Sequence, residues 1–174
     1  MYKEKNYLLK EGKKTRKLKT PKIYVSKPIK INLTSLKNKI YRADLEIDGI
    51  DHSGASYEGR VFLNNPEANQ DTPRNLKNGY VGSIYVFAHG GCYGDSGHCE
   101  IRKERRLYDY RSSNPLLPIK KRLIITIALS KMTKGTKDIR VTIVPILSRN
   151  LPTRNISDFV DIVKIDTIKI LTYA

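Results

Sequence analysis

Tyr57–Cys99 reads YEGRVFLNNPEANQDTPRNLKNGYVGSIYVFAHGGCYGDSGHC. Two apolar runs in this stretch, residues 61–63 and 84–88, carry the β-branched and aromatic side chains expected of buried strands. The segment between the runs is polar, and its turn-forming residues are Pro66, Pro73 and Gly79. The stretch therefore predicts two strands joined by a long connection, and a glycine-rich loop after the second strand.

The segment before this stretch alternates apolar and charged residues. The apolar set is Tyr41, Ala43, Leu45 and Ile47, and the charged set is Arg42, Asp44, Glu46 and Asp48. A period of two is typical of a strand with one face in the core and the other in solvent. We expect this strand to end at the turn-forming pair Asp48-Gly49.

Four further segments have strand character. They are residues 23–33, with Pro28 tolerated only at a sheet edge, 123–129, 139–146 and 159–171. No segment predicts an amphipathic helix longer than two turns. About seven strands at these spacings predict an all-β fold, an antiparallel β-sandwich of jelly-roll-like type, formed by residues 22–174.

The N-terminus differs from the rest of the chain in composition. The whole chain of 174 residues carries a formal charge of +16, and residues 1–22 hold nine Lys or Arg against two Glu. We expect residues 1–21 to form a flexible basic arm, because so few apolar residues cannot offset the entropy of ordering. The arm is either a solvated tail, which we favour, or an electrostatic handle for an anionic partner such as nucleic acid.

The sequence contains no run of 18 apolar residues that could span a membrane. Its N-terminus also lacks the uninterrupted apolar core of an export signal. These two features predict a cytoplasmic protein, with export in complex with a signal-bearing partner as the alternative.

Both cysteines and two of the three histidines lie within one short loop: His89, Cys92, His98 and Cys99. Thiolates and imidazoles together are ligands for zinc or for copper in its reduced state. The spacing is not that of a standard zinc finger or knuckle. A disulfide between Cys92 and Cys99, or two free thiols, is the alternative, and we favour these two outcomes together over a metal site.

Signals of catalysis are absent from the sequence. His52 lies between Asp51 and Ser53, but neighbours in sequence do not make a catalytic triad. The chain has no nucleophile elbow, phosphate-binding loop or paired metal-binding helix motif. The residues therefore give little support for hydrolytic or acid–base catalysis.

Several strings resemble a known family when they are read in order. They are VFLNNPEANQDTP (61–73), YVGSIYVFAHGGCYGDSGHC (80–99), DYRSSNPLLPIKKRLIITIAL (109–129) and RVTIVPI (140–146). Residues 40–147 resemble the C-terminal β-domain of the tyrosinase and polyphenol oxidase family, in its bacterial form, and the final ILTY is also similar. The matching positions would be Tyr80, Gly82, Phe87, His89, Cys92, His98 and Cys99.

The resemblance implies a role. In that family the β-domain packs over a helical domain whose six histidines bind two copper ions, and it keeps the enzyme latent. The present chain has three histidines in all, so it cannot build that centre. The expected function is a non-catalytic accessory module that associates with a type-3 copper oxidase core and caps it, assists its folding or loads its copper. The alternatives are a small copper or zinc carrier and a basic nucleic-acid-binding protein.

Overall fold

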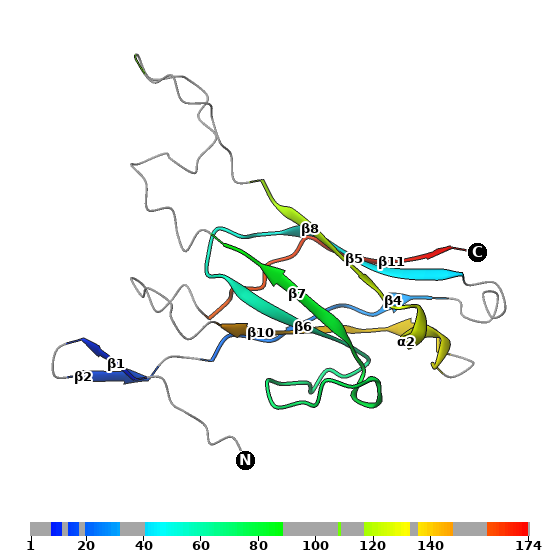
Figure 1. Ribbon diagram of the computed structural model, residues 1–174, viewed down its shortest axis with the longest axis horizontal. Coiled ribbons are helices and arrows are strands. Elements are labelled where there is room, and N and C mark those ends of the chain that lie inside the picture. The colour runs from blue at the N-terminus through cyan, green and yellow to red at the C-terminus, as the bar shows by residue number, and fades with distance from the viewer. Residues whose placement is uncertain are drawn as a thin grey trace.

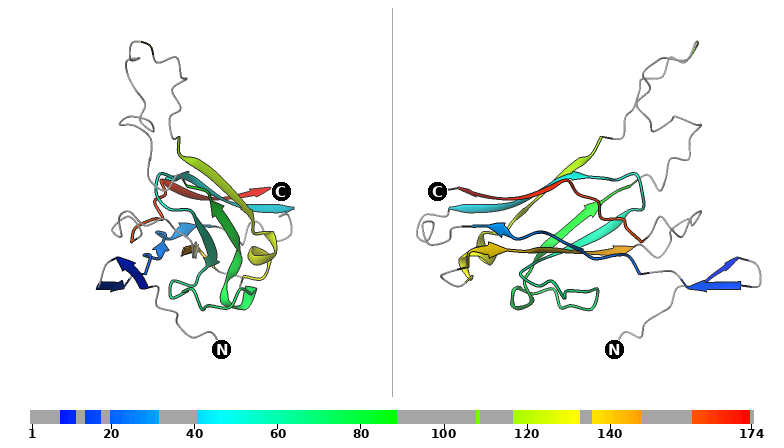
Figure 2. Two further views of the ribbon diagram at one scale, coloured as in Figure 1. Left: turned by 60° about the vertical axis from the view of Figure 1, so that its left-hand side comes forward. Right: turned by 180° about the vertical axis from the view of Figure 1, so that it is seen from behind.

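The computed structural model describes residues 8–11, 14–17, 20–31, 41–88, 108, 117–132, 136–147 and 160–173. Two antiparallel sheets lie face to face in this part of the chain (Figures 1 and 2). The predicted all-β sandwich is therefore confirmed. No helix in the described ranges is long and apolar enough to cross a membrane.

The larger sheet has four strands in the order β3-β10-β6-β7, with bounds Tyr24–Val25, Val141–Leu147, Tyr57–Leu63 and Tyr80–Val86. The second sheet has three strands in the order β11-β5-β8, with bounds Thr167–Tyr173, Arg42–Ile50 and Ile119–Ile124. The described residues also form two two-stranded sheets. They are β4 (Ile29–Lys30) with β9 (Asp138–Ile139), and β1 (Leu8–Glu11) with β2 (Lys14–Lys17). The helical elements among the described residues are η1 (Leu76–Asn78) and α2 (Thr126–Ser130).

The core lies between the two sheets. Alternate residues of each inner strand point into it, as the pleat of a strand requires. The fully buried side chains include Ala43, Leu45, Ile47, Val61, Val86, Val141 and Ile143. Gly82 brings the sheets close at one edge, because a Cβ there would lie 3.3 Å from the Leu123 side chain.

The prediction for β5 is right at three positions and wrong at one. Ala43, Leu45 and Ile47 are fully buried, whereas Tyr41 is 86% exposed. Tyr41 precedes the strand and joins the sheet only through its backbone N–H, which donates to the Tyr173 carbonyl oxygen at 2.8 Å. The strand also runs past the predicted end: a register shift between Ile47 and Ile50 accommodates Gly49, whose φ is 70°.

The charged face of β5 is not solvated as the alternation predicted. Asp44 and Glu46 are buried, because β5 is the central strand of its sheet and the side chains of its neighbours lie over it. Arg122 donates to Glu46 at 2.7 Å and Lys120 donates to it at 3.2 Å. These two hydrogen bonds lower the pKa of Glu46. Arg42 donates to Asp44 at 2.7 Å.

The strand predicted at residues 123–129 is wrong in its position. Strand β8 ends at Ile124, and the single-turn helix α2 follows. The Ile125 N–H donates to the Ala43 carbonyl oxygen, and the Thr126 hydroxyl accepts from the Ala43 N–H at 2.9 Å. The Thr126 hydroxyl thus replaces a strand partner for the Ala43 N–H, so the chain can leave the sheet here. Ile125 and Leu129, one helical turn apart, remain buried.

The remaining strand predictions hold in outline. Residues 23–33 contain β3, at the edge of its sheet, and β4, with Pro28 between them. The segment 139–146 corresponds to β10 and the end of β9, whereas the closing strand, β11, begins only at Thr167. The division into an arm of residues 1–21 and a domain of residues 22–174 stays a prediction.

A second, smaller core lies on the outer face of the four-stranded sheet. Phe62, Ala68 and Val144 are buried there, and the Phe62 and Tyr80 rings meet edge to face with centroids 5.5 Å apart. The connection between β6 and β7 supplies Ala68, so this connection covers part of the outer face. The rest of that face, toward the end of β7, carries the site described below.

Candidate functional site

The predicted metal or disulfide site lies outside the described residues. His89, Cys92, His98 and Cys99 all fall in that part of the chain, so both versions of the site stay predictions. Within the described ranges no group of three or more His, Cys, Asp or Glu side chains could hold a metal ion.

The turn before β6 forms hydrogen bonds with two residues that are far from it in sequence, Ala88 and Leu117. The Ser56 hydroxyl accepts from the Ala88 N–H at 2.8 Å and donates to the Ala88 carbonyl oxygen at 3.2 Å. The His52 Nε2 lies 2.8 Å from the Leu117 carbonyl oxygen. A carbonyl oxygen only accepts, so this bond requires a proton on Nε2. Ala88 and Leu117 are thereby held at the same end of the sandwich, an anchoring role that the sequence did not assign to His52.

The same end of the sandwich holds a polar group. Asp51 accepts from the Ser53 N–H at 2.8 Å and from Lys164 at 3.5 Å. Burial raises the pKa of Asp51, but the Ser53 and Lys164 contacts outweigh burial, and the net pKa is lowered. Burial, with a smaller effect of the Asp51 charge, raises the pKa of Tyr57 to about 12.

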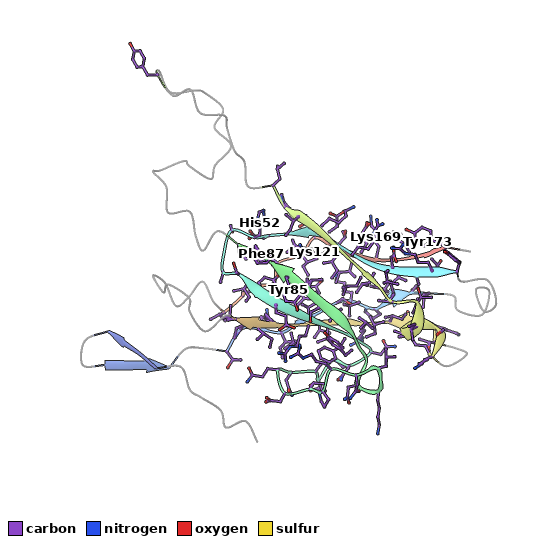
Figure 3. All side chains as sticks on the ribbon, in the orientation of Figure 1. His52, Tyr85, Phe87, Lys121, Lys169 and Tyr173 are labelled. Carbon is purple, nitrogen blue, oxygen red and sulfur yellow. The ribbon has the colours of Figure 1, made fainter. Side chains whose placement is uncertain are left out.

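Two aromatic side chains stand on the outer face at the end of β7. Tyr85 is 56% exposed and Phe87 is 81% exposed, whereas Ile84 and Val86, which alternate with them, are buried. Figure 3 shows both aromatic side chains toward the end of the molecule that also carries His52. We call Tyr85 and Phe87 the aromatic face.

The sequence did not reveal the aromatic face. Residues 84–88 are apolar throughout, so they were predicted as a wholly buried strand. Only the packing shows that the aliphatic residues point inward and the aromatic residues outward. The alternation of aromatic and aliphatic side chains was the available signal for an exposed aromatic side. It could be interpreted only once the structure placed β7 at a sheet edge.

A hydrogen-bonded network borders the aromatic face. Glu58 lies directly opposite Tyr85 on β6. One Glu58 carboxylate oxygen accepts from the Ser83 hydroxyl at 2.8 Å and lies 3.5 Å from an Arg74 guanidinium nitrogen. The Tyr80 hydroxyl lies 2.9 Å from the Ser83 hydroxyl. The network holds Glu58 in one place, so the border of the aromatic face is preorganised.

The aromatic face and the network that borders it have features of a binding surface. The aromatic face supplies large apolar rings, and the network that borders it supplies a partly exposed cation, Arg74. Aromatic residues and arginine are enriched among the residues that dominate binding energy at protein interfaces. Contiguous exposed apolar groups rimmed by polar residues are typical of interaction surfaces.

Comparisons with known proteins gave a structural likeness only. No protein-family model and no curated protein matched the sequence. Recombinant latent aurone synthase, a polyphenol oxidase, co-crystallised with hexatungstotellurate(VI), is similar over 87% of this chain, with a TM-score of 0.49 and 18% identity. The natural-source form of latent aurone synthase is similar over 88%, with a TM-score of 0.46 and 17% identity. The match spans about a quarter of those chains, 24%. The predicted resemblance to a portion of a polyphenol oxidase is confirmed as this structural likeness.

Proposed function

We propose that this protein is a non-catalytic accessory module that associates with a type-3 copper oxidase core through the aromatic face. The proposal starts from the sequence strings that resemble the tyrosinase and polyphenol oxidase β-domain. The observation that carries it is the exposure of Tyr85 and Phe87 within one of those strings, residues 80–99.

The aromatic face has the properties of a docking site. Ile84 and Val86 anchor the backbone on either side of Tyr85 in the core, so the rings are held by a rigid strand. Aromatic rings lose little conformational entropy on binding and contribute large apolar areas. Among the described strands, β7 lies at the edge of its sheet.

The proposed role is to cap the partner and hold it latent. The chain has three histidines, too few for the six-histidine centre of the family, so catalysis is assigned to the partner. Assistance with folding or copper loading uses the same docking surface and differs only in its effect on the partner. The experiment below separates these roles.

The test uses a type-3 copper oxidase core from which its own β-domain has been removed. We expect the chain to bind this core and to slow its oxidation of a diphenol in proportion to occupancy. Tyr85→Ala combined with Phe87→Ala should abolish binding and restore activity. The matched control is Tyr41→Ala, because Tyr41 is an aromatic residue about as exposed as Phe87 and lies beside Tyr173, at the other end of the molecule from Phe87 (Figure 3).

Each outcome is informative. Binding with unchanged oxidation and raised copper content in the core would replace capping by copper loading. Binding that survives loss of both rings would overturn the aromatic face as the docking site. No association with any such core would overturn the proposed function.

A further inference from the structure

A groove of about 570 Å³ lies where the connection between β6 and β7 meets α2. Its lining comes from three separate parts of the chain: Leu63, Asn64 and Asn65; Leu76, Lys77, Asn78 and Gly79; and Ala128, Lys131 and Met132. Figure 1 shows α2 beside the strand ends that bound this connection. The volume falls in the range of small-molecule sites.

The groove is far from the aromatic face. Gly79 precedes the first residue of β7, whereas Phe87 follows its last residue. At about 3.3 Å per residue, the intervening strand separates the two by more than 20 Å. The groove is therefore separate from the aromatic face.

The groove wall is held by hydrogen bonds of its own. The Asn65 side-chain amide donates to the Asn78 carbonyl oxygen at 2.8 Å, and the Asn75 side chain accepts from the Asn78 N–H at 3.0 Å. Gly79 takes a φ of 82°, and a Cβ there would lie 2.2 Å from the Leu63 carbonyl oxygen. The glycine thus allows the connection to press against the end of β6 and to form one side of the groove.

The lining combines apolar and polar side chains with positive charge. Leu76, Ala128 and Met132 supply apolar side chains, whereas the Leu63 side chain is buried in the core. Lys77 and Lys131 are exposed, and neither forms an ion pair with another described residue. No carboxylate is among the described residues that line the groove. Two unneutralised ammonium groups beside an apolar surface complement a ligand with an apolar body and an anionic head.

We propose that this groove binds small amphipathic anions, molecules with an apolar body and one carboxylate or sulfonate group. Lys77 and Lys131 bind the head, and the Leu76, Ala128 and Met132 side chains contact the body. This activity is separate from docking to an oxidase core and does not depend on it.

The test uses decanoate as the probe, with decylamine and decanol as head-group controls. The chain has two methionines, Met1 and Met132, so a ¹³C-methyl methionine spectrum contains a reporter within the groove and one outside it. We expect decanoate to shift the Met132 methyl resonance in a saturable manner and to leave that of Met1 unchanged. Decylamine should not shift the Met132 resonance, and decanol should bind more weakly than decanoate.

Charge-reversal variants separate the groove from the overall basic charge. Lys77→Glu with Lys131→Glu should weaken decanoate binding about tenfold or more, whereas Lys77→Arg with Lys131→Arg should retain it. The matched control is Lys27→Glu with Lys30→Glu, because these exposed lysines carry the same charge and do not line the groove. Circular dichroism verifies that each variant is folded.

Three results would overturn the proposal. The first is equal displacement of the Met132 methyl resonance by decylamine and decanoate. The second is equal loss of binding in the groove variant and the control variant, which would assign binding to net charge. The third is no shift of the Met132 resonance at any decanoate concentration at which the probe stays monomeric. None of these results bears on association with an oxidase core.

Discussion

Glu46 and Arg122 lie opposite each other on β5 and β8, and the Arg122 guanidinium donates to the Glu46 carboxylate at 2.7 Å. The pair sits on the outer face of the three-stranded sheet, yet Glu46 is buried by its neighbours. Lys120 donates to the same carboxylate. The face that the sequence predicted to be solvated is thus a network of paired charges.

The first prediction concerns the charge of Glu46. Glu46→Lys should lower the melting temperature by several degrees, because a third cation would replace the acceptor of Arg122 and Lys120. Had this face been solvated, the change would be silent. Glu67→Lys makes the same charge change at an exposed position and should leave the melting temperature unaltered. Equal melting temperatures for the two variants would contradict the network.

The same carboxylate predicts an acid dependence of stability. The pKa of Glu46 is lowered by folding, so its stabilising contribution is fully present above the unfolded value near 4.5 and is lost as pH falls through the folded pKa. Urea unfolding between pH 7 and pH 3 measures this loss. Glu46→Gln should be less stable than wild type at pH 7, and the difference should shrink toward pH 3. A constant difference would contradict the assigned cause of the pKa shift.

Tyr57 predicts an alkaline dependence. Folding raises its pKa from 10.0 to about 12, so the unfolded chain loses this proton first and stability falls as pH rises from 10 toward 12. The Tyr57 hydroxyl has no hydrogen-bond partner among the described residues. The free energy of unfolding of Tyr57→Phe should therefore lie within about 1 kcal/mol of the wild-type value at pH 7. At pH 11 the variant should be the more stable of the two. Urea unfolding at both pH values measures this, and parallel pH profiles would refute it.

Leu45 tests the core. Its side chain is fully buried between the sheets, so Leu45→Ala should destabilise the protein by about 2–5 kcal/mol through lost burial and a residual cavity. Tyr41→Ala, four residues earlier on a position that is mostly exposed, should change stability by less than about 0.5 kcal/mol. Urea unfolding measures the free energy of unfolding of both variants. Comparable losses of stability would mean that Leu45 does not face the core and would contradict the register of β5.

The cysteine pair gives the last prediction. We expect Cys92 and Cys99 to form a bridge under oxidising conditions, which intact mass spectrometry reports as a loss of about two mass units that reductant reverses. Under reducing conditions the native mass reports any bound copper or zinc. Metal that disappears in Cys92→Ser with Cys99→Ser would support the ligand version of the site. Free thiols without metal under both conditions would contradict both versions.

Local periodicity predicted much of the fold correctly. The apolar alternation in β5 and the β-branched run of β6 identified strands, because a period of two depends only on the backbone of the strand itself. The position of Pro28 also predicted an edge, since proline cannot donate to a ladder. The segment after Ile124 was mistaken for a strand, because Ile125 and Leu129 satisfy a helical spacing equally well over five residues.

The sequence by itself determined the fold class, the buried face of β5 and the absence of a six-histidine centre, since each depends on residue type and local spacing. Only the tertiary structure decided which surfaces are free. It buried Glu46 by placing β5 between two strands, exposed Phe87 at a sheet edge, and brought Lys77 and Lys131 to one groove. These outcomes follow from contacts between segments far apart in the chain, whose pairing no local pattern encodes.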